Sequence, residues 1–178
     1  VGEHNAAVAA GAASICGVST WLSDFGVFGL DEVYNQQRLS GINGAHLKTV
    51  LTHCGLDVGE DGKTHHCIDY VAGARNFFGW RIVVPADRLQ TDRVVRRIAG
   101  EQGCWLVAVG RSKLPVLTGE DGRPLFGGEY TFRYGEATLA RAGTDVALLV
   151  MGGPSSAACA AADDLVGQGV SASVTVVS

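Results

Sequence analysis

The segment L-T-H-C-G-L-D-V-G-E-D-G-K-T-H-H-C, residues 51–67, contains three of the chain's five histidines, together with carboxylates and cysteines. Imidazole donates, accepts and transfers protons near neutral pH, and a nearby carboxylate fixes its tautomer. His53, Asp61 and His65 therefore predict a cluster that binds and protonates a carbonyl or polyhydroxylated substrate. Arg111 would suit a phosphate or carboxylate tail of that substrate, because a guanidinium binds such groups through two hydrogen bonds.

Spacing alone leaves two other kinds of site open in this segment. A metal site is disfavoured, because the histidines lack HxxxH or HExxH spacing, and Glu60 and Asp61 lie between glycines that are typical of turns. A nucleophilic cysteine is also disfavoured. No oxyanion-hole pattern accompanies Cys54 or Cys67, and both suit the edge of a core. We therefore expect no metal to be bound by these side chains.

The elements that would position these residues alternate between short apolar runs and longer segments of helical spacing. Strands are expected at residues 17–22, 47–53, 80–85 and 104–110, and helices at residues 6–14, 30–41, 67–78 and 89–103. This alternation predicts an α/β fold with a parallel sheet. Ligands meet the carboxyl ends of parallel strands, where His53 and Arg111 would lie, so a simple polar loop is the less favoured interpretation.

The alternation breaks at about residues 114–134, where glycines and prolines gather and predict a linker with a β excursion. A strand, a helix and a strand are expected again within residues 145–177. One such unit cannot bury a core alone, so it predicts the beginning of a second domain. The abrupt start and the end inside a predicted strand lead us to expect a piece of a longer protein.

Composition excludes several classes of protein. The chain is 47% hydrophobic and 18% charged with a net charge of −4, so it lacks the basic surface that nucleic acid requires. Residues 6–22 are mostly Ala, Gly and Ser, too weakly hydrophobic for a membrane span. The five cysteines are odd in number and lack CxxC spacing, which favours a reducing, cytoplasmic compartment. We expect neither nucleic acid nor membrane as a partner.

Five segments resemble the transketolases, the thiamine-diphosphate enzymes, and follow the family order from residue 2 to about 119. G-E-D-G-K-T-H-H at residues 59–66 is similar to the family's G-E-D-G-P-T-H-Q, and G-E-H at residues 2–4 to its R-E-H. F-G-V-F at residues 25–28 matches a Phe-x-x-Phe pair, and V-V-P-A-D at residues 83–87 matches R-P-A-D. G-R-S-K-L-P-V-L-T-G at residues 110–119 matches S-R-Q-N-L-P-x-L-x-G.

The resemblance implies an organisation of the whole chain. Residues 1–117 would form a parallel-sheet, thiamine-diphosphate-binding (pyrimidine) domain with helices on both faces. Residues 118–133 would be a linker. Residues 134–178 would begin the transketolase C-terminal domain, a second α/β domain that is incomplete here.

The resemblance also implies how the cofactor is held. Glu3 matches the carboxyl group at the pyrimidine ring nitrogen of thiamine diphosphate, which favours the tautomer that deprotonates the cofactor's reactive carbon. Burial beside aromatic rings would raise the pKa of Glu3. Phe25 and Phe28 match the pair that packs on the pyrimidine ring, where flat aromatic side chains give a large contact at little entropic cost.

Substrate contacts follow from the same likeness. His53 and His65 resemble the pair that faces the reacting oxygens, Asp61 a residue that binds a substrate hydroxyl, and Arg111 a contact for a phosphate tail. Glu60 would support the turn. The segment 54–57, C-G-L-D in place of D-S-I-G, departs from the family around the sugar-binding wall, so the donor and acceptor stay open.

A partner chain is implied as well. The family binds the diphosphate and Mg²⁺ with a G-D-G segment followed by an asparagine, and this sequence has no such arrangement. The metal would therefore be bound mainly by the partner. An N-terminal, pyrophosphate-domain subunit of a split transketolase would fit, with a heterotetramer as the expected assembly.

The predicted function is transfer of a two-carbon ketol unit between sugars or sugar phosphates, by an enzyme that is active only with its partner. One alternative is a related thiamine reaction, either 2-oxoacid decarboxylation with acyl transfer or a deoxyxylulose-type condensation. Another is a non-catalytic paralogue that pairs with a transketolase and regulates it. A stand-alone nucleotide-binding domain is the least favoured.

Overall fold

The computed structural model describes residues 2–178, which form two compact units. The first unit takes in the described chain as far as Val83, together with Arg97–Ser112. The second consists of Val84–Arg96 and Lys113–Ser178. The division therefore does not follow the chain from one end to the other, and each unit is described by itself.

A parallel sheet forms the centre of the first unit. Its four strands are β1 (Trp21–Phe25), β2 (Lys48–Thr52), β3 (Trp80–Val83) and β4 (Cys104–Ala108), in the order β1-β2-β4-β3. All neighbouring pairs run parallel. Every residue of β4 is buried, as a continuous apolar run predicts for a central strand.

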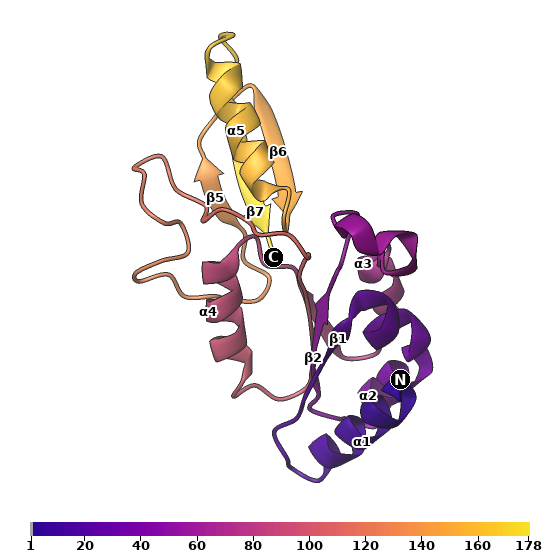
Figure 1. Cartoon of the computed structure of the whole chain (residues 1–178). Coiled ribbons are helices and arrows are strands. Elements are labelled where there is room, and N and C mark those ends of the chain that lie inside the picture. The colour runs from indigo at the N-terminus through magenta and orange to yellow at the C-terminus, as the bar shows by residue number, and fades with distance from the viewer. Residues whose placement is uncertain (1) are drawn as a thin grey trace. The chain divides into compact units, whose positions relative to one another are not determined.

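Helices cover one face of this sheet. They are α1 (Glu3–Ile15), α2 (Tyr34–Ile42) and α3 (Tyr70–Ala74), with a π-helix η1 (Val27–Glu32) and a 3₁₀ helix η2 (Gly59–Thr64) between them. α1 and α2 lie side by side (Figure 1). A β-carbon on Gly11 of α1 would lie only 2.7 Å from Ser40 Oγ of α2, so this pair of helices packs closely because Gly11 has no side chain.

A buried glutamine fixes η1 relative to the sheet. Gln37 Nε2 donates to the carbonyl oxygen of Gly29, 3.0 Å away, and lies 3.3 Å from Thr49 Oγ1 on β2. The backbone carbonyl oxygen of Gln37 accepts a 3.1 Å hydrogen bond from Trp80 Nε1. Because a buried amide without partners is costly, these contacts specify one position for the π-helix.

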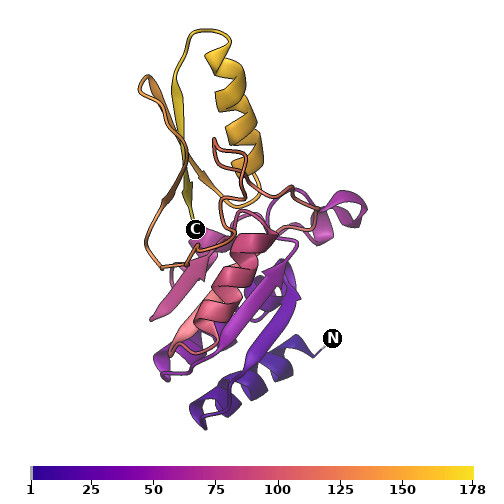
Figure 2. The same cartoon turned by 90° about the vertical axis from the view of Figure 1, so that its left-hand side faces the viewer.

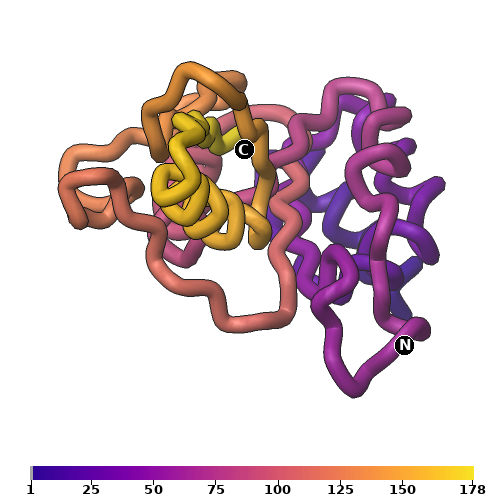
Figure 3. Tube along the Cα trace, turned by 90° about the horizontal axis from the view of Figure 1, so that it is seen from above, coloured from indigo at the N-terminus to yellow at the C-terminus, as the bar shows by residue number. Residues whose placement is uncertain are grey.

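The second unit has its own sheet and core. Strands β5 (Thr138–Arg141), β6 (Val146–Met151) and β7 (Ala172–Val177) take the order β5-β7-β6, with β5 antiparallel and β6 parallel to β7. Helix α5 (Ser155–Val166) lies along one face of this sheet (Figures 2 and 3). The core contains Phe126, Cys159, Val174 and Val176.

Helix α4 (Arg88–Ile98), which connects β3 to β4 along the chain, groups mostly with the second unit because of hydrogen bonds at its beginning. Buried Asp87 accepts from the amides of Gln90 and Leu117, both at 2.8 Å. The Gln90 side chain accepts in turn from the amide of Ala86 at 2.7 Å. This reciprocal arrangement is a form of capping box, and Leu117 joins it to the rest of the unit.

The predicted α/β class is confirmed, and several elements differ from expectation, among them the helix predicted at residues 30–41, which is the π-helix η1 followed by α2. The first strand is Trp21–Phe25 rather than residues 17–22, because it is an edge strand whose burial alternates. The helix expected at residues 67–78 is only Tyr70–Ala74, since Cys67 forms a β-bridge with Cys54. Strand β5 was not predicted, since it is short and lies at an edge.

We expect Asp87→Ala to lower the free energy of unfolding by about 2–4 kcal/mol, because the helix cap is lost and the buried amide of Leu117 has no acceptor. Urea denaturation would measure the change. Asp92→Ala on the same helix is the matched control. Its exposed ion pair with Arg96 should contribute little to stability. Equal losses in the two variants would contradict the role of Asp87.

Candidate active site

The predicted site residues other than Glu3 gather at one edge of the first unit's sheet. Phe25 is the last residue of β1, and His53 directly follows β2. Arg111 lies three residues beyond β4, the neighbour of β2. These are the carboxyl ends of three adjacent parallel strands, the position at which α/β sheets bind ligands.

Aromatic and imidazole rings form the centre of this site. The centroid of the Phe25 ring lies 4.2 Å from that of His53 and 5.4 Å from that of His65. Phe28 meets His65 edge-on, with centroids 5.5 Å apart and an interplanar angle of 84°. Two segments far apart in the sequence, 25–28 and 53–65, are thus joined by direct ring contacts.

Two glycines allow the Phe-x-x-Phe segment to lie this close. A β-carbon on Gly26 would be 2.5 Å from Cys67 Cβ, and one on Gly29 would be 2.5 Å from Leu51 Cδ2. Any larger residue would push η1 away from β2 and displace Phe28. Neither glycine was predicted from the sequence to have a role, although their places beside the two phenylalanines were a usable signal.

His53 has an unusual backbone conformation. Its φ of 57° makes it the one non-glycine residue with positive φ in the described part of the chain. A β-bridge holds it there: the amide of Gly55 donates to Cys67 O at 2.8 Å, and the amide of Cys67 to His53 O at 3.5 Å. Left-handed conformations in such residues are often found where a side chain must be aimed at a site.

A chain of charged groups extends from His53 toward solvent. Asp61 Oδ2 lies 3.4 Å from His53 Nε2 and 2.9 Å from Arg111 Nε. On the other side of the guanidinium, Arg111 Nη2 lies 2.7 Å from Glu60 Oε1. Hydrogen bonds from its own backbone amide and from Arg111 lower the pKa of Glu60. The structure therefore adds Glu60, expected only to support the turn, to the residues around Arg111.

The two cysteines of the segment are not suited to nucleophilic chemistry. Both Cys54 and Cys67 are buried and free of disulfides. A hydrogen bond with Cys67, followed by burial, strongly raises the pKa of Cys54, so its thiol stays protonated. They act as packing residues against Gly26.

Glu3 begins α1 and is half-buried in the single chain. The neighbouring His4 Nδ1 lies 3.5 Å from Glu32 Oε1, so the start of α1 lies beside the end of η1. The raised pKa that the resemblance implies for Glu3 stays a prediction.

Two kinds of feature are absent from residues 2–178. Within them, no group of three or more His, Cys, Asp or Glu side chains is arranged to bind a metal ion. No helix in the same range is both long and apolar enough to cross a membrane.

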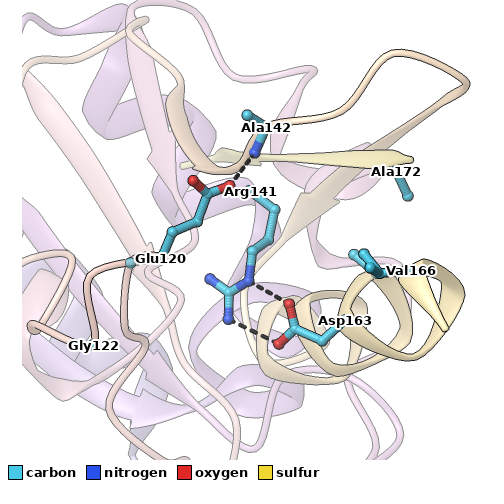
Figure 4. A pocket seen from close by; sticks show the side chains of 9 residues that line it. Glu120, Gly122, Arg141, Ala142, Asp163, Val166 and Ala172 are labelled. Carbon is cyan, nitrogen blue, oxygen red and sulfur yellow. Dashed lines mark hydrogen bonds and ion pairs between the residues drawn. The ribbon is translucent and has the colours of Figure 1, made fainter. Parts of the chain in front are cut away.

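The second unit contains a separate cavity of about 300 Å³ beside Arg141 (Figure 4). Its guanidinium is already occupied: Nε and Nη2 bind Asp163 at 2.7 and 3.1 Å, and Nη1 donates to Thr118 O at 2.8 Å. The ion pair raises the pKa of Arg141 and leaves little positive charge for a ligand. The candidate active site is therefore the edge of the first unit.

Comparisons with known proteins agree with this architecture. The family model "Transketolase, pyrimidine binding domain" matches residues 1–116. The "Putative transketolase C-terminal section" of Methanocaldococcus jannaschii is 26% identical over 175 residues, covering 98% of this chain and 54% of that protein. The transketolase of Staphylococcus aureus is 35% identical over 142 residues, covering 77% of this chain and 20% of its own length.

A solved structure, "Split gene transketolase, inactive beta4 tetramer", superposes with a TM-score of 0.85 at 27% identity, covering 99% of this chain and 54% of that one. This chain also covers only 18% of Transketolase-like protein 2 of Bos taurus, and so spans between about a fifth and a half of these relatives. Since the family model covers well over half of the sequence, the chain belongs to the transketolase family, in the section with the pyrimidine-binding domain.

Proposed function

We propose that the chain is one subunit of a thiamine-diphosphate-dependent transketolase that moves a two-carbon ketol unit between sugars or sugar phosphates. The observation that supports this most directly is the contact of the Phe25 ring with the imidazoles of both His53 and His65. An aromatic platform beside two groups that transfer protons suits a flat cofactor and a hydroxylated substrate.

The platform fits the aromatic end of the cofactor. The Phe25 side chain is 37% exposed, although an aromatic ring at a strand end would normally be covered. Stacking with a pyrimidine ring would remove this apolar surface from water. Thiamine diphosphate, when bound, supplies a centre that stabilises negative charge on the substrate carbon. Glu3 would hold the proton that it shares with a ring nitrogen.

The histidines would position and protonate the substrate. His53 Nε2 lies 3.4 Å from Asp61 Oδ2, and Nδ1 lies 3.0 Å from Thr52 Oγ1, so these two groups would orient the ring while the Asp61 carboxylate accepts a hydrogen bond from a substrate hydroxyl. Thr64 Oγ1, 2.9 Å from Nδ1, orients the His65 ring, and we assign proton transfer to His65 Nε2. Arg111 would contact an anionic tail farther from the reacting carbon.

A second subunit completes the proposed enzyme. The sequence has no G-D-G segment followed by an asparagine, so the diphosphate and Mg²⁺ would be bound by a partner with the pyrophosphate domain. The similar solved structure is that of a split-gene transketolase in the form of an inactive β4 tetramer. By analogy we propose an N-terminal partner subunit, with a heterotetramer as the active assembly.

Mixing the chain with that partner, Mg²⁺ and thiamine diphosphate should give ketol transfer from a ketose phosphate, because only then are both ends of the cofactor bound. A coupled assay comparing ketose phosphates with pyruvate measures it. Turnover of pyruvate alone would favour the related oxoacid or deoxyxylulose-type reaction. Stable assembly without turnover of any ketose donor would contradict the proposal.

Glu3→Gln should reduce ketol transfer by at least about 100-fold, the usual contribution of a positioned proton-transfer group, while leaving assembly intact. Steady-state rates and sedimentation would be measured on the same samples. Glu32→Gln is the control, because it also removes one carboxylate, from the neighbouring π-helix. This variant should keep most activity. An assembled protein that is insensitive to Glu3→Gln would instead indicate a regulatory paralogue.

Two adjacent histidines provide a sharper comparison. His65→Ala should lower kcat/KM by about 100-fold or more, because His65 faces the aromatic platform. His66→Ala should change it by less than about threefold, because the His66 ring bonds to a loop carbonyl, Leu56 O at 3.0 Å, away from that platform. A larger loss from His66→Ala would show that the site residues are wrongly assigned.

A further inference from the structure

Arg111 lies beside Asp61, one of the proposed substrate-binding residues, and between two carboxylates of different character. Asp61 binds Nε at 2.9 Å, and its side chain is 33% exposed. Glu60 binds Nη2 at 2.7 Å, and its side chain is 80% exposed. Asp61 also faces His53, whereas Glu60 pairs with the guanidinium from the solvent side. The inner carboxylate is therefore tied to the rest of the site, and the outer one is tied to Arg111.

The loop backbone shapes this outer contact. Gly59 has a φ of 68°, and a β-carbon there would lie 3.0 Å from Arg111 Nη1. The guanidinium thus lies against the loop where only glycine leaves room. Because Glu60 is the next residue, the turn at Gly59 directs its carboxylate to the open side of Arg111.

Comparison with Arg141 indicates which arginine can give up its carboxylate partner to an incoming anion. Arg141 is 15% exposed, binds both oxygens of Asp163 and donates to a backbone carbonyl, as Figure 4 shows for the carboxylate pair. Arg111 offers Glu60 a single contact at an exposed position. Exposed pairs of this kind contribute little free energy, so an incoming anion can replace Glu60 but not Asp163.

We infer that Glu60 is a specificity-determining residue, whose carboxylate occupies the outer side of Arg111 and has to be displaced by an anionic substrate tail. The inference rests on the proposed function in taking Arg111 as the contact for such a tail. A phosphate group would form the two-pronged contact that guanidinium favours, and the displaced carboxylate would turn toward solvent. Glu60 therefore weakens binding of phosphorylated ligands and leaves uncharged sugars unaffected.

Direct binding to the full chain tests this, with inorganic phosphate, ribose 5-phosphate and ribose as probes in calorimetric or NMR titrations. Glu60→Gln should raise the affinity for both phosphate-bearing probes by about three- to tenfold at low ionic strength and leave ribose unchanged. The gain should shrink at about 0.5 M salt, because the removed repulsion is screened. The gain should vanish when Arg111→Gln is added, because the guanidinium for which Glu60 and phosphate compete is then absent.

The matched control is Glu136→Gln, which removes an exposed carboxylate from an ion pair with Arg133. No gain from Glu60→Gln, an equal gain from Glu136→Gln, or a gain that persists in the Arg111→Gln background would each overturn the inference. Absence of phosphate binding in every variant would overturn it as well. These measurements do not depend on turnover. If Glu60→Gln raised phosphate affinity and the assembled protein showed no ketol transfer, the proposed function would be contradicted and the inference about Glu60 would stand.

Discussion

One carboxylate oxygen, Asp61 Oδ2, lies between the imidazole of His53 and the guanidinium of Arg111, and the arrangement of the site depends on it. The imidazole and the guanidinium follow neighbouring parallel strands, β2 and β4, and the Asp61 carboxylate contacts both. No residue of the η2 segment that supplies Asp61 is buried. Val58, immediately before this segment, is fully buried, so hydrophobic burial and charge together keep the loop against the sheet.

The opposite wall of the site depends on close packing. Gly26 and Gly29 leave no room for a side chain against Cys67 and Leu51, so the polypeptide between β1 and α2 lies directly on the core. Two phenylalanines three residues apart would ordinarily be core residues, yet Phe25 is 37% exposed. The site thus combines the segment 25–29, which is fixed by steric contact, with a loop held by ion pairs and by buried Val58, and the imidazoles lie where the two meet.

Much of the fold could be predicted from the sequence, because β4 is a buried apolar run and the alternation of strands with helices implies parallel pairing. The bounds of edge strands were harder to predict, because the run at residues 17–22 does not coincide with Trp21–Phe25, the residues of β1 that pair with β2. For the site, family resemblance gave residue types and order. It could not give the contact of Glu60 with Arg111, because that depends on the left-handed turn at Gly59 and not on any spacing rule.

The polypeptide passes between the two units three times, after Val83, Arg96 and Ser112. Asp87 and Gln90 at the beginning of α4 bind the amide of Leu117 and the hydroxyl of Ser178, far along the chain. A gene segment that ended after Ser112 would encode α4 but lose both of these neighbours. Recombination within this family can therefore exchange the two units together far more readily than it can exchange either as a separate module.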